Sequence, residues 1–171
     1  MSEIVPQIPL SFDEFIQSEP QENKESSDDS CESIIEVFKK ERIEWTKKIT
    51  ELSGLMKKIE TISDLMVQVY TERQRMVEYY HYLISLLSKI NKIYRKQYAD
   101  KYDYYTYKSQ KRFPNERNKE LQILSELSDI ILKKEAFEQH SHFAEKTIST
   151  IDNIIYGIKS RVEVENMLRG K

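Results

Sequence analysis

The chain has 171 residues, of which 39% are hydrophobic and 33% are charged, with only three glycines and four prolines. Its 27 basic and 29 acidic residues give a formal net charge of −2. This length fits one domain, and the scarcity of glycine and proline argues against the many turns of a β-sandwich or barrel. We therefore expect an all-α protein built from long helices.

Several classes of protein are excluded by what the sequence lacks. No apolar run approaches the roughly 18 residues that a membrane-spanning helix needs, and no basic leader precedes an apolar signal core. Cys31 is the only cysteine, which excludes an internal disulfide and a multi-cysteine zinc site. We expect a cytoplasmic protein that does not bind membranes.

The near-neutral total conceals a division of charge along the chain. Residues 1–33 carry nine acidic residues and one basic residue, a net charge of −8, whereas the rest carries 26 basic and 20 acidic residues, or +6. Three of the four prolines also lie in this first segment. The composition predicts a disordered acidic tail over residues 1–33 and a helical body over residues 34–171.

The tail contains one short pattern that is typical of a helix start. Ser11 and Glu14 have the spacing of a capping box, and Leu10 and Phe15 have the spacing of a hydrophobic staple. A helical motif over residues 11–16 that forms on binding is one interpretation. The other is a solvated tail in which this common pattern occurs by chance.

From Glu32 to Phe113 the body contains no proline and a single glycine, Gly54. Its apolar residues recur at steps of three and four: Trp45, Ile49, Leu52, Met56, Ile59, Met66, Tyr70, Val77, Tyr80, Ile84, Leu87, Tyr94 and Tyr98. This period predicts a coiled coil or a helical hairpin. Either the helix folds back at residues 61–64, where capping residues cluster, or another chain packs along it.

Pro114 and the capping residue Asn115 predict a new helix over residues 116–138, followed by a joint at residues 140–142. The last helix should end near Gly170. Its apolar stripe has the spacing of an oligomer interface and consists of Ile148, Ile151, Ile155, Ile158 and Val162. Packing of this stripe onto the same chain is an equal alternative, because periodicity does not identify the partner.

The sequence contains no motif for catalysis, phosphate binding or a metal ion, so we expect neither an enzyme nor a cofactor. We interpret His81 as a packing or surface residue. His140 and His142 are two positions apart, which on a helix points them to different sides, and no further ligand accompanies them.

Residues 89–119 combine cations with aromatic rings. This segment holds ten basic and three acidic residues, a net charge of +7, together with six tyrosines and Phe113. Proteins that bind single-stranded DNA use cations for the phosphates and flat rings for the bases. The predicted binding residues are Lys92, Arg95, Lys96, Lys101, Tyr104, Tyr105, Tyr107, Lys108, Lys111, Arg112, Phe113 and Arg117. The alternative is a plain basic helix end, and we assign Tyr94 and Tyr98 to a core stripe.

Two stretches resemble the UvsY family of phage recombination mediators. Residues 98–105 (YADKYDYY) are similar to its basic-x-Asp-Tyr-Tyr stretch, and residues 151–161 (IDNIIYGIKSR) to its last helix. The chain also ends in Gly170 and Lys171, as some members do. The family pattern differs where this chain has Ala99 and Thr106.

The resemblance implies an all-helical, ring-like homo-oligomer that binds single-stranded DNA. Such proteins help to load a RecA-like recombinase onto strands coated by single-strand DNA-binding protein. Lys101 would take the basic DNA-contacting position, with Tyr104 and Tyr105 as the tyrosine pair. We therefore expect a non-enzymatic recombination mediator. The alternatives are a self-assembling coiled-coil scaffold that does not bind nucleic acid and an adaptor that binds proteins through its acidic tail.

Overall fold

The computed structural model describes residues 27–56 and 62–170, so the motif predicted over residues 11–16 lies outside the described residues. The described residues form helices and no strands, which confirms the all-α prediction. In chain order these are α2 (Ser27–Leu55), α3 (Ile62–Asp103), the π-helix η2 (Tyr104–Lys108), α4 (Glu116–Glu126) and α5 (Ser128–Arg169). Helix α2 thus begins earlier than the body boundary predicted at residue 34, since acidic residues suit a first helical turn.

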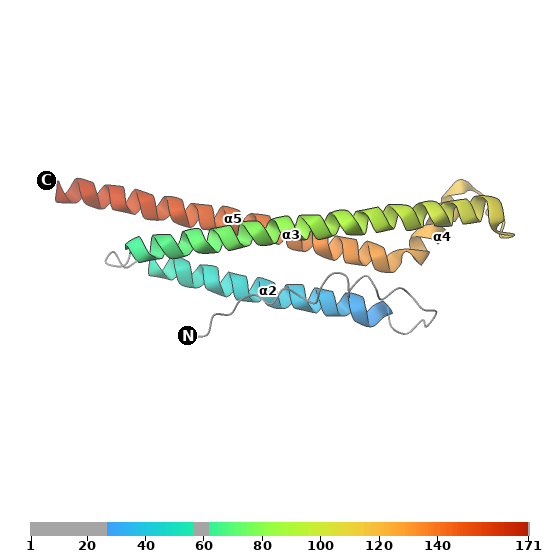
Figure 1. Ribbon diagram of the computed structural model, residues 1–171, viewed down its shortest axis with the longest axis horizontal. Coiled ribbons are helices and arrows are strands. Elements are labelled where there is room, and N and C mark those ends of the chain that lie inside the picture. Colours follow the sequence, from blue (N-terminus) through green and yellow to red (C-terminus); the bar gives the residue numbers. More distant parts are fainter. Residues whose placement is uncertain (1–26, 57–61, 171) are drawn as a thin grey trace.

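The helices form a rod (Figure 1). Helices α3 and α5 have 42 residues each and therefore span about 63 Å at about 1.5 Å per residue. They run antiparallel, α2 lies along part of the pair, and α4 lies at one end of the rod (Figure 1). The predicted fold-back is confirmed to within a few residues, because α2 ends at Leu55 and α3 begins at Ile62.

The core lies between α3 and α5, with α2 covering one side. Helix α3 contributes Leu65, Val69, Met76, Leu83, Leu86 and Ile90, and α5 contributes Phe137, Ala144, Ile151, Ile154, Ile155 and Ile158. The predicted stripe is wrong at Tyr70 and Ile84, whose side chains are 44% and 36% exposed. Each follows another apolar residue, Val69 or Leu83, so two stripes about 100° apart were available and the pattern did not choose between them.

A buried polar cluster joins α2 to the α3–α5 pair. The Tyr79 hydroxyl donates to Glu41 at 2.5 Å and lies 2.9 Å from His140 Nε2, which is itself 2.9 Å from the Glu41 carboxylate. Arg42 donates to Nδ1 of the same imidazole at 3.3 Å, and Phe38 stacks on it with ring centroids 4.0 Å apart. Burial, and then the bond to Glu41, raise the pKa of Tyr79 well above its ordinary value.

The far end of α2 is fixed by close approach to α5. A Cβ atom at Gly157 would lie 2.7 Å from the terminal methyl of Met56, so any larger residue there would require the flexible Met56 side chain to shift. The Arg161 guanidinium donates to the Met56 carbonyl, which follows the last residue of α2. An orphan carbonyl at a helix end thus receives a charged donor.

The predicted start at Glu116 is confirmed, with the Asn115 side chain accepting from the Asn118 amide at 2.8 Å. The predicted joint at residues 140–142 is wrong. The break comes at Leu127, whose backbone leaves the helical region and whose amide lies against carbonyls at the end of α4. His140 instead sits in the middle of α5, fully buried against Phe38 and Tyr79.

Candidate nucleic-acid interface

The end of the rod that carries α4 is held together by aromatic rings. Tyr94, Tyr98 and Tyr102 follow one face of α3, with neighbouring ring centroids 6.1 Å and 6.4 Å apart. All three are half-buried, in line with the core stripe expected for the first two. Lys134 Nζ of α5 lies 5.6 Å from the Tyr94 ring centroid, so this row of tyrosines also contacts α5.

A buried lysine fixes the start of α4 to the end of α3. Lys119 Nζ lies 2.9 Å from the Glu116 carboxylate, 3.0 Å from the Thr106 hydroxyl and 4.0 Å from the centroid of the Tyr102 ring. The bond to Glu116 raises the pKa of Lys119 despite desolvation. A buried ammonium is tolerated here because an anion, a hydroxyl and an aromatic face surround it. We call this contact the Lys119 lock.

The end of α4 is fixed by Glu126. Lys101 Nζ lies 2.6 Å from its carboxylate, and the Tyr105 hydroxyl and the Gln122 amide donate to its other oxygen. Burial opposes ionisation of Glu126, but the bonds from Lys101, Tyr105 and Gln122 outweigh it and lower its pKa to about 2. The hydrogen bond between Tyr105 and Glu126, and then burial, raise the pKa of Tyr105 to about 12.

The structure therefore divides the predicted binding residues into two groups. Lys101 and Tyr105 are engaged with Glu126, and Phe113 is half-buried with its ring edge-on to Tyr105 at 5.3 Å. These three hold the end of the rod together. The second group is exposed: Lys92, Arg95, Lys96, Tyr104, Tyr107, Lys108, Lys111, Arg112 and Arg117.

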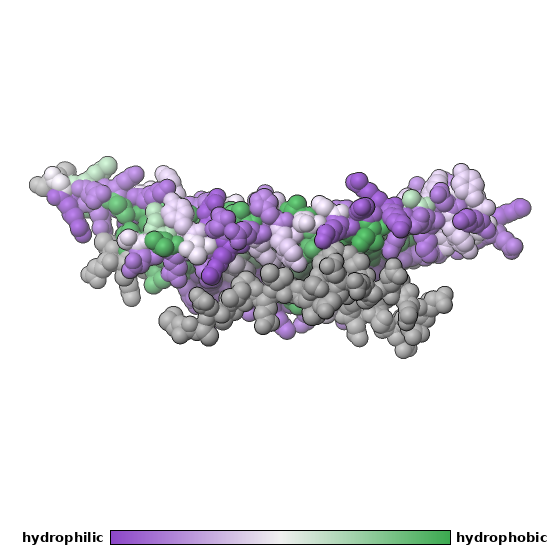
Figure 2. Space-filling view, viewed as in Figure 1, coloured by the Kyte–Doolittle hydropathy of each residue, from purple (hydrophilic) through white to green (hydrophobic). Residues whose placement is uncertain are grey.

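The exposed group lies in two places. Lys92, Arg95 and Lys96 share the outer face of α3, and we call them the α3 row. The remaining six come from η2, the following loop and the start of α4, and we call them the cation–tyrosine end: Tyr104, Tyr107, Lys108, Lys111, Arg112 and Arg117. Figure 2 shows hydrophilic residues gathered at the tip of the rod that carries α4.

Within the cation–tyrosine end, η2 sets the direction of the tyrosines. Its last turn closes with the Ser109 amide donating to the Tyr104 carbonyl at 2.8 Å, five residues back. The side chain of Tyr107 is left 81% exposed and that of Tyr104 49% exposed. Lys111 is bound to Gln122 at 2.9 Å, but no described acidic residue forms an ion pair with Lys108, Lys111, Arg112 or Arg117.

Comparison of the chain with protein-family models, curated proteins and solved structures gives no match.

The residues of the predicted oligomer interface lie on α5, away from the cation–tyrosine end, and are largely buried. Ile151, Ile155 and Ile158 are buried in the chain's own core, Ile148 packs against that core, and Val162 is half-buried. The stripe therefore packs onto its own chain, which was the second of the two interpretations of its periodicity. In the closed bundle the three buried isoleucines are not accessible to a second copy.

Elsewhere the described residues offer little for chemistry. They contain no group of three or more His, Cys, Asp or Glu residues placed to hold a metal ion, and His81 is exposed.

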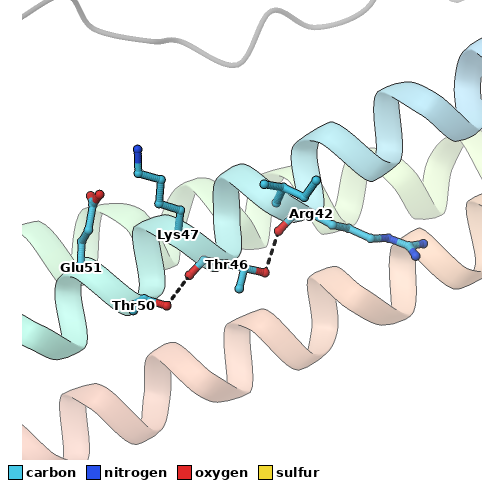
Figure 3. Close-up of a pocket in the computed structure, with 6 residues that line it drawn as sticks. Arg42, Thr46, Lys47, Thr50 and Glu51 are labelled. Atoms are coloured by element: carbon cyan, nitrogen blue, oxygen red, sulfur yellow. Dashed lines mark hydrogen bonds between the residues drawn. The ribbon is translucent and has the colours of Figure 1, made fainter.

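A depression on α2 is lined by Arg42, Ile43, Thr46, Lys47, Thr50 and Glu51 (Figure 3). Its two threonine hydroxyls donate to backbone carbonyls one turn back, and Lys47 and Glu51 point away from α5. Among the described residues, no helix is long and apolar enough to span a bilayer.

Sequence reasoning missed the residues that organise the end of the rod. The pairing of Glu116 with Lys119 could have been suspected from their spacing of three on a helix. The contacts of Lys119 with Tyr102 and of Glu126 with Lys101 join residues 17 and 25 positions apart. These contacts depend on how α4 folds back on α3, which no local pattern encodes.

Proposed function

We propose that the protein binds single-stranded nucleic acid, DNA above all, through the cation–tyrosine end. The observation that carries this proposal is the side chain of Tyr107, 81% exposed within a segment that also presents Lys108, Lys111, Arg112 and Arg117. An exposed ring is accessible for stacking, and nucleobases are flat partners for such a ring. The cations beside it suit the phosphates that accompany those bases.

The chemistry favours single strands and little sequence preference. Stacking on Tyr104 or Tyr107 needs an unpaired base, and every base has a face on which a ring can stack. The cations contact phosphates, which are the same at every position. The α3 row adds three exposed cations farther along α3, separated from the cation–tyrosine end by the exposed Asp100 and Asp103.

The two intramolecular contacts behind this surface act as positioning elements. The Lys119 lock and the Glu126 contacts hold η2 and α4 against α3, so that the exposed side chains need not be ordered anew on binding. Lys101 and Tyr105 belong to this support in our proposal, and Tyr107 replaces Tyr105 as the stacking residue.

We propose further, on the resemblance to the UvsY family, that this binding serves recombination. The protein would act as a non-enzymatic mediator that holds a strand in a conformation preferred by a RecA-like recombinase and assists its loading onto strands coated by single-strand DNA-binding protein. Self-association into a homo-oligomer belongs to the same proposal.

A self-assembling scaffold is the second candidate, and one observation favours it. The last turns of α5 carry Val164, Met167 and Leu168, whose side chains are 55%, 70% and 68% exposed. Apolar residues left uncovered at a helix end are typical of contacts between chains. A scaffold of this kind would not need the cations at the opposite end.

Binding of a fluorescent oligothymidylate at several salt concentrations tests the proposal. The variant Lys108→Ala/Arg112→Ala/Arg117→Ala should bind at least about tenfold more weakly at low salt. Its salt slope should fall by about two units, at about 0.7 per lost single-strand phosphate contact. These residues are exposed and have no ion pair with a described residue, so the fold should be unaffected.

The matched control removes the same charge elsewhere. Lys47, Lys146 and Lys159 are exposed and lie outside the cation–tyrosine end. Their replacement by alanine should leave the salt slope unchanged. Equal affinities and slopes for both triple variants would refute the site and leave the scaffold standing.

A further inference from the structure

The sequence of the same chain contains a segment whose charge is opposite to that of the cation–tyrosine end. Residues 1–26 contain six acidic residues and one basic residue, together with Phe12 and Phe15. Carboxylates bind lysine and arginine as phosphates do, and phenyl rings pack on tyrosine as bases do. The segment therefore carries both chemical groups that a single strand would bring.

The contacts of α2 show where this segment joins the rod. Phe38 packs edge-on against Phe137, with ring centroids 5.0 Å apart, and Glu41 meets Tyr79. Ser27 precedes Phe38 by eleven positions, about 16 Å along the helix at about 1.5 Å per residue. Helix α2 runs parallel to α5 and antiparallel to α3, so this shift brings its start level with the first turns of α5 and with the α3 row (Figure 1).

The distance from that point to the cation–tyrosine end is short relative to the segment. Lys92 and Lys108 are 16 positions apart, about 24 Å along α3 and η2 at about 1.5 Å per residue. A chain covers at most about 3.3–3.6 Å per residue, so at least about seven of the 26 residues are needed to bridge this gap. If α2 ran parallel to α3, its full length of 29 residues would separate residues 1–26 from these cations.

We propose that the acidic N-terminal segment, residues 1–26, occupies the cation–tyrosine end of its own chain and competes there with single-stranded nucleic acid. This inference rests on the proposed function and names its regulation. Competition of this kind is intramolecular, so a weak contact suffices because its effective concentration is high. A partner with a basic surface that binds the segment would release the site.

Full-length variants with matched controls test the competition. Asp13→Asn/Glu14→Gln/Glu19→Gln removes three negative charges from the segment. Glu44→Gln/Glu51→Gln/Glu163→Gln removes the same charge from exposed positions on α2 and α5. The first variant should bind oligothymidylate at least threefold more tightly than the control at 50 mM NaCl. The difference should shrink at 300 mM, because salt screens contacts between exposed charges.

A second variant separates contact from long-range charge. Phe12→Ala/Phe15→Ala leaves the net charge unchanged and should also tighten binding if the rings pack on Tyr104 or Tyr107. Hydrogen exchange without DNA reports on the same contact, and exchange over residues 104–113 should be faster in both segment variants than in the wild type. If both variants match the control in affinity and in exchange, the inference is overturned and the proposed function stands.

The remaining outcomes are also decisive. If no variant binds DNA, the proposed function fails, and exchange over residues 104–113 alone decides whether the segment contacts this end. If the protection depends on protein concentration, the segment binds a second copy, and the intramolecular proposal is wrong.

Discussion

The middle of the rod and the end that carries α4 are stabilised by different means. In the middle, aliphatic side chains such as Val69, Met76 and Ile151 are fully buried between the helices. At the end, the contacts are made by tyrosine rings, the buried ammonium of Lys119 and the carboxylate of Glu126. Packing of the first kind gains its free energy from the removal of apolar surface from water.

The difference bears on what each region can present to solvent. An aliphatic core needs partners on every side, so the middle of the rod is covered by α2. Among the described residues α2 does not extend over the end, where α4 packs on α3 and the rings of Tyr94, Tyr98 and Tyr102 are half-buried. Lys108, Arg112 and Arg117 are exposed there and form no ion pair with a described acidic residue. In our proposal this is the surface that binds nucleic acid.

The largest expected effect comes from placing a charge in the middle of the rod. Ile155 is 7% exposed, so Ile155→Asp should bury an unpaired carboxylate and destabilise the bundle by more than about 4 kcal/mol. Thermal unfolding followed by circular dichroism should lose its cooperative transition. The control Leu168→Asp, at a side chain 68% exposed, should unfold within about 0.5 kcal/mol of the wild type.

The outcome also separates the two interpretations of the isoleucine stripe. If the stripe were an oligomer interface, Ile155→Asp would give smaller species in sedimentation while its helical signal and transition persisted. That result would contradict the core position of Ile155 and would show that the stripe forms an interface between chains.

The sequence was informative wherever a local pattern had a single solution. The absence of proline and the steps of three and four predicted long helices, and Asn115 predicted the start of α4. The pattern could not choose between Leu83 and Ile84, because neighbouring apolar residues offer two faces. It gave no sign of the turn at Leu127, which contains neither glycine nor proline and is set by the fold of α4 onto α3. The role of His140 escaped for the same reason, since its partners lie on α2 and α3.

A smaller effect is expected at the end of the rod from loss of a single ring. Tyr107→Ala should weaken binding of an oligothymidylate by about 1–3 kcal/mol, the usual contribution of stacking one base on an aromatic side chain. Tyr107→Phe should retain most of the affinity, because stacking needs the ring and not the hydroxyl. Fluorescence anisotropy measures both.

Tyr156 provides the matched control, because its side chain is 73% exposed and lies on α5 outside the cation–tyrosine end. Tyr156→Ala should bind the oligonucleotide as the wild type does. A loss of similar size in the two alanine variants would show that Tyr107 has no special role.

The smallest effect concerns the carboxylate that fixes the end of α4. The pKa of Glu126 is lowered to about 2 from its ordinary value of 4.5. A carboxyl with a depressed pKa in the folded state stabilises the fold at pH values above its ordinary pKa. That contribution is lost as the pH falls through the folded value. Because the contact is local, hydrogen exchange over residues 104–126 is a more sensitive measure than global unfolding.

Glu126→Gln removes this titration, because the amide stays neutral at every pH. At pH 6, exchange over residues 104–126 should be faster in the variant than in the wild type, after correction for intrinsic rates. The difference should narrow as the pH is lowered from about 4.5 toward 2, because protonation of Glu126 makes the wild type resemble the variant. Glu120→Gln, an exposed position on the same helix, should behave as the wild type throughout. A difference between Glu126→Gln and the wild type that stays constant down to pH 2 would show that the ion pair with Lys101 does not hold α4 in place.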